Sequence, residues 1–250
     1  MSARLNIGLI GSGFMGQAHA DAYRRAAMFY PDLPKRPHLY ALADQDQAMA
    51  ERHAAKLGAE KAYGDWRELV NDPQVDVVDI TSPNHLHYTM AMAAIAAGKH
   101  VYCEKPLAVN EQQAQEIVAR GSATAEGLNG QTSMLFSWQN GMQGLLNTTL
   151  FSNTPGGAVV AGRQATLTID GQFYAPGGFT LAASQGGQVL RWEEPRNRYD
   201  QLFWQAEHFA WCIGQGVQDS PLRPLSRVLQ NLQVMDEVRR QVGAVFNEER

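Results

Sequence analysis

The sequence contains little cysteine, since Cys103 and Cys212 are the only two in its 250 residues. Two cysteines so far apart do not form the disulfide framework that many small secreted proteins use. The first residues lead directly into an apolar segment and lack the apolar core and cleavage site of a signal peptide. We therefore expect reduced thiols and a cytoplasmic location.

The chain also lacks an excess of basic charge and any long hydrophobic run. Its formal net charge is −4, which argues against a basic surface for nucleic acid or for an anionic membrane. The apolar runs have the length of strands and are too short to span a bilayer. Nucleic acid and membranes are therefore not expected as partners.

What the first half does contain is a regular alternation of apolar strand-like segments and helix-forming segments. The expected strands cover residues 5–10, 39–43, 75–80 and 100–103. The expected helices cover residues 15–28, 47–56 and 86–97, with a further helix from 110 to about 120. This order predicts an α/β fold with a parallel, doubly wound sheet.

A glycine-rich turn, Gly11-Ser12-Gly13-Phe14-Met15-Gly16, follows the first expected strand. Gly11 permits the tight turn, Gly13 lets the backbone approach a pyrophosphate, and Gly16 allows close packing of helix on strand. Phosphate charge would lie on the free amides at the helix start, beside Phe14 and Met15. The turn therefore predicts dinucleotide binding, with a tight turn that binds no ligand as the alternative.

Asp44 ends the second expected strand and is the candidate ligand for the adenosine ribose. It lies further from Gly11 than the usual spacing of about 20 residues, and a proline-rich loop at residues 31–37 accounts for the excess. A carboxylate accepts ribose hydroxyls and repels a 2′-phosphate, and residues 45–47 supply no cation. We therefore expect NAD as the preferred cofactor and NADP as the alternative; a solvated loop aspartate is the other interpretation.

The segment after the third expected strand holds Ser82, Pro83, Asn84 and His87. Pro83 forces an extended exit, and Asn84 is a natural N-cap for the next helix. This segment is a candidate lining for the nicotinamide pocket, with His87 close by. A helix cap and a satisfied polar histidine are the structural alternatives, and we expect His19 to serve in packing or support.

Lys105 follows the fourth expected strand, between Glu104 and Pro106. Open α/β sheets bind ligands at the carboxyl ends of their strands. A lysine held there can donate to a substrate hydroxyl or carbonyl and assist proton movement during hydride transfer, with Glu104 orienting it. The alternative is a surface ion pair of negligible energetic value.

The second half favours strands before it returns to helices. Expected strands cover residues 132–138, 143–151, 164–169, 179–183 and 188–192, with a hairpin turn at Asn140-Gly141. These predict an antiparallel sheet with one apolar face. Helices are expected at residues 199–213 and 225–246, and His208 is more naturally a core or surface histidine than a catalytic group.

Together these residues resemble the glucose-fructose oxidoreductase / inositol dehydrogenase / MocA (Gfo/Idh/MocA) family. The segments that carry the resemblance are GLIGSGFMGQAHADAY, ALADQD and TSPNHLHYTMAMAAIAAGKHVYCEKPLAV. The resemblance implies a Rossmann domain at residues 1–121 and an α+β domain at residues 122–250, whose open, mostly antiparallel sheet forms homo-oligomers. It also implies NAD(P)-dependent hydride transfer to or from a sugar, polyol or related secondary alcohol.

The resemblance also assigns roles to particular residues. Those implied to contact the cofactor are Gly11, Gly13, Phe14, Met15, Gly16, Asp44, Ser82, Pro83, Asn84, His87, Glu104 and Lys105. Lys105 is in addition the implied catalytic lysine, and no metal is implied.

The chain departs from the family pattern after about residue 120. The family's next Rossmann strand, and the later segment that carries a catalytic Asp and His, have no counterpart in the sequence. Loss of that strand would leave residues 100–103 at the edge of the sheet, so we expect another segment or subunit to cover it. Three functions stay open: an active dehydrogenase, a catalytically impaired nucleotide-binding relative, and a nucleotide-regulated interaction protein.

Overall fold

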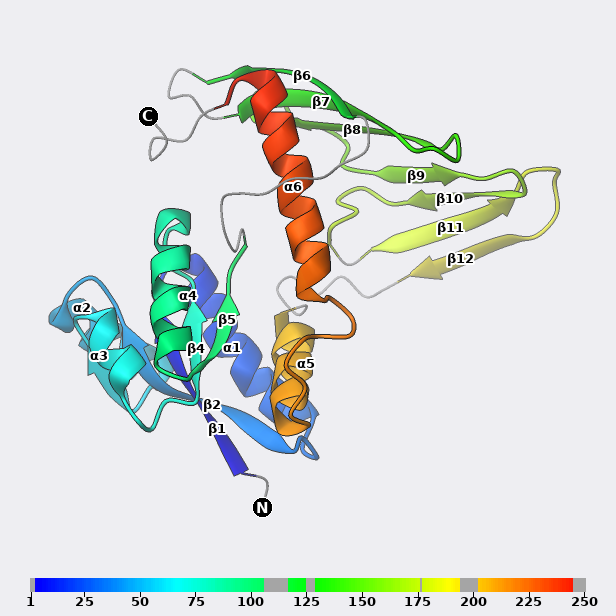
Figure 1. The fold of residues 1–250 in the computed structure, drawn as a ribbon. Helices are drawn as coiled ribbons and strands as arrows, with labels where there is room; N and C mark the ends of the chain where they lie inside the picture. The colour runs from blue at the N-terminus through cyan, green and yellow to red at the C-terminus, as the bar shows by residue number, and fades with distance from the viewer. Residues whose placement is uncertain (1–2, 106–116, 125–128, 176, 194–201, 245–250) are drawn as a thin grey trace.

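The computed structural model describes residues 3–105, 117–124, 129–175, 177–193 and 202–244. Its first half contains a five-stranded parallel sheet in the order β3-β2-β1-β4-β5 (Figure 1). The strands are β1 (Ala3–Ile10), β2 (Lys35–Ala43), β3 (Lys61–Tyr63), β4 (Val77–Ile80) and β5 (His100–Cys103). The predicted α/β class is confirmed.

Helices cover both faces of this sheet, because the strand order reverses after β3. The chain crosses back over the sheet and adds β4 on the other side of β1. They are α1 (Phe14–Phe29), α2 (Gln47–Leu57), α3 (Trp66–Asn71), the 3₁₀ turn η1 (Asn84–Leu86) and α4 (His87–Ala96). α3 and α4 bury their apolar side chains in one core cluster, and α1 and α2 contribute to clusters on the other side. Apolar residues of β1 and β4 are therefore buried from both sides.

The ends of α2 show how local chemistry places a helix beside the glycine turn. The Asp46 carboxylate accepts a hydrogen bond from Met49 N at 2.8 Å, which caps the first turn. Gly58 ends the helix with a φ of 75°, a left-handed conformation that favours glycine. Both ends of α2 are therefore fixed by local contacts, and these ends set where its side chains lie.

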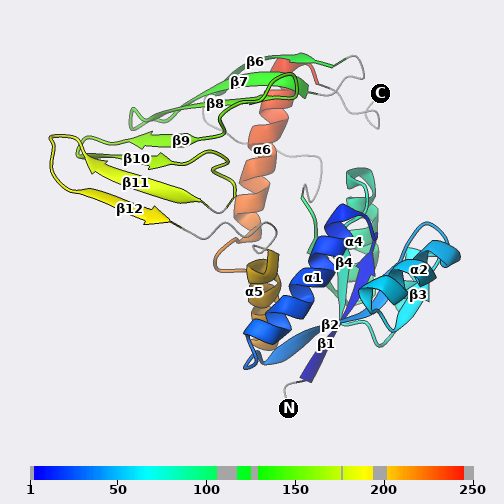
Figure 2. The ribbon, with the colours of Figure 1, turned by 180° about the vertical axis from the view of Figure 1, so that it is seen from behind.

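Helix α5 (Leu202–Gly214) returns to the first sheet from the far end of the chain. Its buried face, with Ala206, Ala210 and Ile213, shares one core cluster with Leu5 and Ala22 of the first half. Figure 2 shows α5 beside α1, in agreement with their contacts. A helix that the resemblance places in the second domain therefore completes the core of the first.

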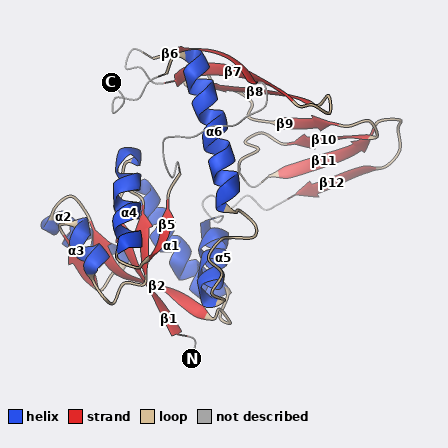
Figure 3. Ribbon diagram, viewed as in Figure 1, coloured by secondary structure: helices blue, strands red, loops and turns tan. Residues whose placement is uncertain are grey.

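The rest of the second half forms two antiparallel sheets rather than one continuous meander. The first contains β6 (Ile117–Ala123), β7 (Asn129–Ser137) and β8 (Gln143–Thr149). The second contains β9 (Ala158–Ala161), β10 (Ala165–Ile169), β11 (Gly178–Ala183) and β12 (Val189–Glu193). Helix α6 (Leu225–Val242) packs on the first of these sheets (Figure 3).

The expectation of a helix reaching Arg120 was wrong over its last residues. Ile117–Ala123 is a strand, and it pairs antiparallel with β7. Ala119 is fully buried in a cluster with Val238 of α6, so packing against a distant helix stabilises the strand. Residues 110–116 lie outside the described part of the chain. The domain boundary expected after residue 121 falls inside β6 and stays a prediction.

Two further local expectations differ from the structure. Asn84 does not cap α4; it is the first residue of η1, and no side-chain cap bond precedes that turn. The short elements β3, α3 and β9 were not expected. The strand order places β5 at a sheet edge as expected, and no strand of the described residues pairs with its outer side. That a segment or subunit covers this edge stays a prediction.

Candidate functional site

The carboxyl ends of four parallel strands lie side by side, and the predicted site residues follow directly from them. Backbone hydrogen bonds continue the sheet past its last residues: Gly11 N to Ala43 O at 2.9 Å, Thr81 N to Ile10 O at 3.0 Å, and Glu104 N to Ile80 O at 2.9 Å. The glycine turn, Asp44, the segment after β4 and Lys105 are therefore gathered at one edge of the sheet.

The glycines of the turn meet the demands that dinucleotide binding makes of them. Gly11 has a φ of 94°, and a Cβ there would lie 3.1 Å from Thr81 O. A Cβ on Gly16 would lie 2.1 Å from Gly11 O, so only glycine fits. A Cβ on Gly13 would meet nothing within 4 Å, and this exposed position leaves room for a phosphate to reach the backbone. The turn therefore fits a pyrophosphate.

Helix α1 begins immediately after this turn, as the sequence predicts. Gln17 N donates to Gly13 O at 3.0 Å, so the helical hydrogen bonding begins at the turn itself. Phe14 is exposed and Met15 is partly buried in the first turn of the helix. The amides of a first helical turn have no helical acceptor, and a phosphate can use them.

Asp44 lies against the turn rather than in open solvent. Its carboxylate accepts hydrogen bonds from Ser12 Oγ, from Ser12 N at 3.2 Å and from Gln45 N at 2.8 Å. Burial alone would raise the pKa of Asp44, but these bonds and a contact with His53 hold it below its ordinary value. Asp44 is therefore ionised and able to accept hydroxyl groups.

His53 is a member of this group that sequence reasoning missed. It projects from α2, and its Nδ1 contacts Ser12 Oγ and lies 3.5 Å from Asp44 Oδ2. Helical spacing brings His53 back to the strand end, although it stands several residues after Asp44 in the chain. The sequence signal was present, since His53 stands three residues after the buried Ala50 and four before the buried Leu57, the spacings of one helix face.

The segment after β4 presents two of its predicted residues to solvent. Pro83 and Asn84 are exposed at the carboxyl end of the strand, where a nicotinamide ring can reach them. His87 is buried, and its Nε2 donates to Ser82 O at 2.8 Å. Ser82 Oγ in turn lies 3.3 Å from Met90 Sδ. His87 therefore positions the backbone of this segment.

Lys105 is exposed just beyond β5, and Glu104 holds its backbone. Glu104 Oε2 accepts a hydrogen bond from Lys105 N at 3.1 Å, while Oε1 accepts one from His19 Nε2 at 3.0 Å. Glu104 was predicted to orient Lys105, and the contact that the structure shows between them is to the main chain of Lys105. Since His19 belongs to α1, the glycine-turn helix and Lys105 are joined by two hydrogen bonds.

His19 forms a buried charged network that the sequence did not specify. Its Nδ1 donates to Asp79 at 3.0 Å, and Tyr23 Oη donates to the same carboxylate at 2.6 Å. Both ring nitrogens face carboxylates, so both carry hydrogen and the ring is an imidazolium. Burial alone would lower the pKa of His19, but Asp79 and Glu104 raise it to about 10.

Tyr102 closes this network on the side of α5. Its ring stacks on His19 at a centroid distance of 5.2 Å and on Phe209 at 4.9 Å. Tyr102 Oη donates to Gln205 Oε1 at 2.9 Å. Helix α5 thus shields the imidazolium from water and strengthens its attraction to the carboxylates.

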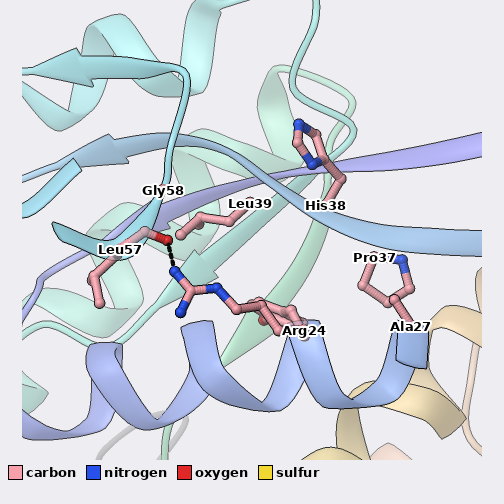
Figure 4. Close-up of a pocket in the computed structure, with 8 residues that line it drawn as sticks. Arg24, Ala27, Pro37, His38, Leu39, Leu57 and Gly58 are labelled. Carbon is pink, nitrogen blue, oxygen red and sulfur yellow. Dashed lines mark hydrogen bonds between the residues drawn. The ribbon is translucent and has the colours of Figure 1, made fainter. Parts of the chain in front are cut away.

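A separate pocket lies away from the glycine turn, between α1, the start of β2 and the end of α2 (Figure 4). Arg24 crosses it and donates to the carbonyl of Leu57, where α2 ends. Pro37 and His38 line it from the amino end of β2, opposite the edge at which α/β sheets bind ligands. We assign Arg24 a structural role there.

Within the described residues, no group of three or more His, Cys, Asp or Glu could hold a metal ion. The part of the chain that is described also contains no helix long and apolar enough to cross a membrane. His208 Nε2 lies 2.8 Å from Ser220 Oγ, which itself accepts from the amides of Leu222 and Arg223.

The fold and the turn define a dinucleotide-binding α/β protein. The family described as "Oxidoreductase family, NAD-binding Rossmann fold" (Gfo/Idh/MocA) matches residues 5–126. The crystal structure of an NAD binding oxidoreductase from Klebsiella pneumoniae is 35% identical, covers 98% of this chain and 100% of that one, and has a TM-score of 0.79. The chain belongs to this family of oxidoreductases, as predicted.

Two curated relatives align with less than half of this chain. A levoglucosan dehydrogenase from Pseudarthrobacter phenanthrenivorans is 45% identical over 113 residues, and a myo-inositol 2-dehydrogenase from Thermotoga maritima is 38% identical over 106 residues. The aligned part of this chain spans 29% of the length of each. Levoglucosan dehydrogenase in complex with NADH and levoglucosan has a TM-score of 0.77 at 18% identity, a likeness of fold alone.

Proposed function

We propose that this protein is an NAD-dependent dehydrogenase that acts on a sugar, polyol or related secondary alcohol. The observation that carries the proposal is the joining of Lys105 to the glycine-turn helix through Glu104 and His19. This connection holds a proton-transfer group at a set position relative to the dinucleotide turn. The names of relatives that act on levoglucosan and inositol support the substrate class.

The residues present fit the cofactor, which would supply the hydride acceptor at its nicotinamide ring. Gly13 and the start of α1 would hold the pyrophosphate on main-chain amides. Asp44 would exchange its bonds from Ser12 for bonds from the ribose hydroxyls. Pro83 and Asn84, both exposed, would border the nicotinamide side.

Lys105 would manage the proton of the substrate hydroxyl. In the direction of oxidation, its Nζ accepts the proton that the hydroxyl releases, and in the direction of reduction it returns that proton. Because Glu104 uses both carboxylate oxygens on His19 and on the Lys105 amide, the lysine side chain extends from a fixed main chain. This anchoring fixes the point from which the lysine side chain extends.

Replacing Lys105 tests the proposal. We expect Lys105→Ala to lower kcat by about 100-fold or more, the usual scale of a lost acid–base group, and to leave NADH affinity almost unchanged. Lys35→Ala, at the amino end of β2, is the matched control and should retain full turnover. The alcohols tested in this assay should include levoglucosan and myo-inositol. Equal losses of turnover and NADH affinity would contradict the assigned role.

One observation favours a second candidate, a relative that binds the nucleotide but is catalytically impaired. The trans-1,2-dihydrobenzene-1,2-diol dehydrogenase of Xenopus tropicalis aligns at 20% identity over 310 positions, covering 86% of this chain and 93% of the relative. That alignment is longer than this 250-residue chain, so it contains gaps opposite it. The gaps support the prediction that this chain lacks a segment of the family pattern. Saturable NADH binding without turnover of any tested alcohol would favour this candidate.

We further propose that the protein forms homo-oligomers in the cytoplasm. The four-stranded sheet supports assembly, because β11 and β12 carry Phe179 and Trp192, whose partly exposed rings stack at 5.3 Å. Leu181 and Leu190 are paired on the same face and are also exposed. An exposed apolar sheet face of this kind marks an interaction surface.

A further inference from the structure

We propose that His53 is a specificity-determining residue of the cofactor site, and that its protonation makes the preference for NADH over NADPH depend on pH. The inference rests on the proposed binding of the adenosine ribose at Asp44. It adds a residue that neither the glycine motif nor the family resemblance assigns. It also adds a basic side chain to the surroundings of Asp44, where residues 45–47 supply no cation.

The argument begins with the position of His53. Its ring touches Ser12 Oγ and stands 3.5 Å from the Asp44 carboxylate, the group expected to bind the ribose hydroxyls. Its side chain is 34% exposed, whereas that of Asp44 is 10% exposed. The imidazole is therefore more exposed than the carboxylate beside it, and a group that binds this carboxylate will lie close to the ring.

The hydrogen bonds around Ser12 determine which group donates and which accepts. Ser12 Oγ has one proton, which it donates to Asp44, so His53 Nδ1 must donate to Ser12 Oγ. A ribose hydroxyl that takes the place of Ser12 on Asp44 will meet the same imidazole N–H. A 2′-hydroxyl needs no charge there, whereas a 2′-phosphate needs a cation.

A pH dependence of cofactor preference requires a group near the ribose that changes charge near neutral pH. Histidine is the side chain that ordinarily changes charge between about pH 5 and 8, so in this proposal the ring is a cation at lower pH and a neutral N–H donor at higher pH. One charge interaction at about 4 Å in water changes an equilibrium constant by about fivefold. We therefore expect the affinity for NADPH, relative to NADH, to fall by about fivefold as pH rises through this range.

Asp44 and Ser12 are the groups that face the His53 ring directly. Its own helix also carries two basic side chains, Arg52 next to it and Lys56 one turn further on. The Lys56 ammonium is held 3.1 Å from Gln17 Oε1. His53→Gln leaves this ammonium in place, so its charge is common to the variant and the wild type.

The test is a fluorescence titration of the wild-type chain with NADH and with NADPH between pH 5.5 and 8.5. Its readout is the ratio of the two dissociation constants. The variant is His53→Gln, which keeps a polar side chain and removes the titration. The control is His38→Gln, at the amino end of β2, where His38 pairs with Glu60. The 2′-phosphate titrates near pH 6 itself, and the variant measures that contribution alone.

We expect the relative affinity for NADPH to fall about fivefold more with rising pH in the wild type and in His38→Gln than in His53→Gln. An equal pH dependence in all three proteins would overturn the role of His53 while leaving the proposed cofactor site intact. A wild type that binds neither nucleotide would overturn the cofactor site and this inference with it. If His53→Gln fails to fold, NMR resonances of the His53 ring in the wild type measure its pKa with each nucleotide bound. NADPH must raise its pKa relative to NADH, because the coupling is reciprocal.

Discussion

At the residue scale, the buried imidazolium of His19 carries charge where water cannot stabilise it. Its side chain is 2% exposed, and its two carboxylate partners are Asp79 and Glu104. Removing one member of such a group leaves an uncompensated buried charge, which costs about 3–5 kcal/mol. We expect His19→Gln to lower the free energy of unfolding by this amount at pH 7, measured by urea denaturation. His38→Gln, which removes a more exposed pair with Glu60, should cost less than about 1 kcal/mol.

The same residue predicts a pH dependence with a definite sign. The pKa of His19 is raised to about 10 in the folded protein, against about 6.5 in the unfolded chain. Its stabilisation is therefore fully present below about pH 6.5 and is lost as the pH rises through about 10. The difference in unfolding free energy between wild type and His19→Gln should shrink from pH 7 to pH 10.5. A difference that stays constant would show that His19 is not the titrating group.

Some of these residues could be predicted from the sequence and others could not, for physical reasons. Gly11, Gly13 and Gly16 act through the local shape of one turn, so a short motif specifies them. Asp79 and His53 act through partners on other elements, and one sequence does not state those contacts. The signal for Asp79 was a carboxylate inside the apolar strand of residues 75–80, which required a buried partner.

At the scale of elements, the turn between β1 and α1 contains two glycines with different roles: Gly16 is required by packing, and Gly13 is proposed to bind the pyrophosphate. A Cβ at Gly16 would lie 2.1 Å from Gly11 O, so Gly16→Ala should cost about 1–3 kcal/mol or more of stability. A Cβ at Gly13 meets nothing within 4 Å, so Gly13→Ala should unfold at the same temperature as the wild type. The same methyl group stands where a pyrophosphate would approach, and NADH affinity should fall. Equal thermal stability of the two variants would contradict this division.

The elements that sequence reasoning missed are those that tertiary contacts stabilise. β3 has three residues, and it forms because it pairs with the end of β2. Ile117–Ala123 reads as the continuation of a helix, yet its buried Ala119 packs on α6 and its main chain pairs with β7. Long apolar segments such as β1 and β4 were recognisable because burial on both faces leaves a continuous pattern.

At the scale of the whole molecule, the exposed face of the β9–β12 sheet predicts self-association. Trp192 and Leu190 lie on one face of β12, and Val189 lies on the opposite face because side chains alternate. We expect Trp192→Glu to shift the protein to a smaller species in light scattering coupled to size exclusion. Val189→Glu introduces the same charge on the other face and should not change the assembly. A wild type that is monomeric at all concentrations would contradict the proposal.

The return of α5 to the first sheet could not have been predicted from its amphipathic pattern. Such a pattern states that Ala206, Ala210 and Ile213 are buried, but it does not state the surface that covers them. The structure places them against α1 and β1, so the two halves of the chain share one core. Phe209 of this helix also stacks on Tyr102, next to the His19 network. Chain segments far apart in sequence therefore support the proposed site together.

The measurement that tests the central claim most directly is a fluorescence titration of the purified wild-type chain with NADH. The glycine turn, the ionised Asp44 and the open approach to Gly13 predict saturable binding, with NADPH binding more weakly at pH 8. Lys105→Ala should bind NADH as the wild type does. The absence of saturable binding of either nucleotide would contradict the account of this edge of the sheet as a dinucleotide site.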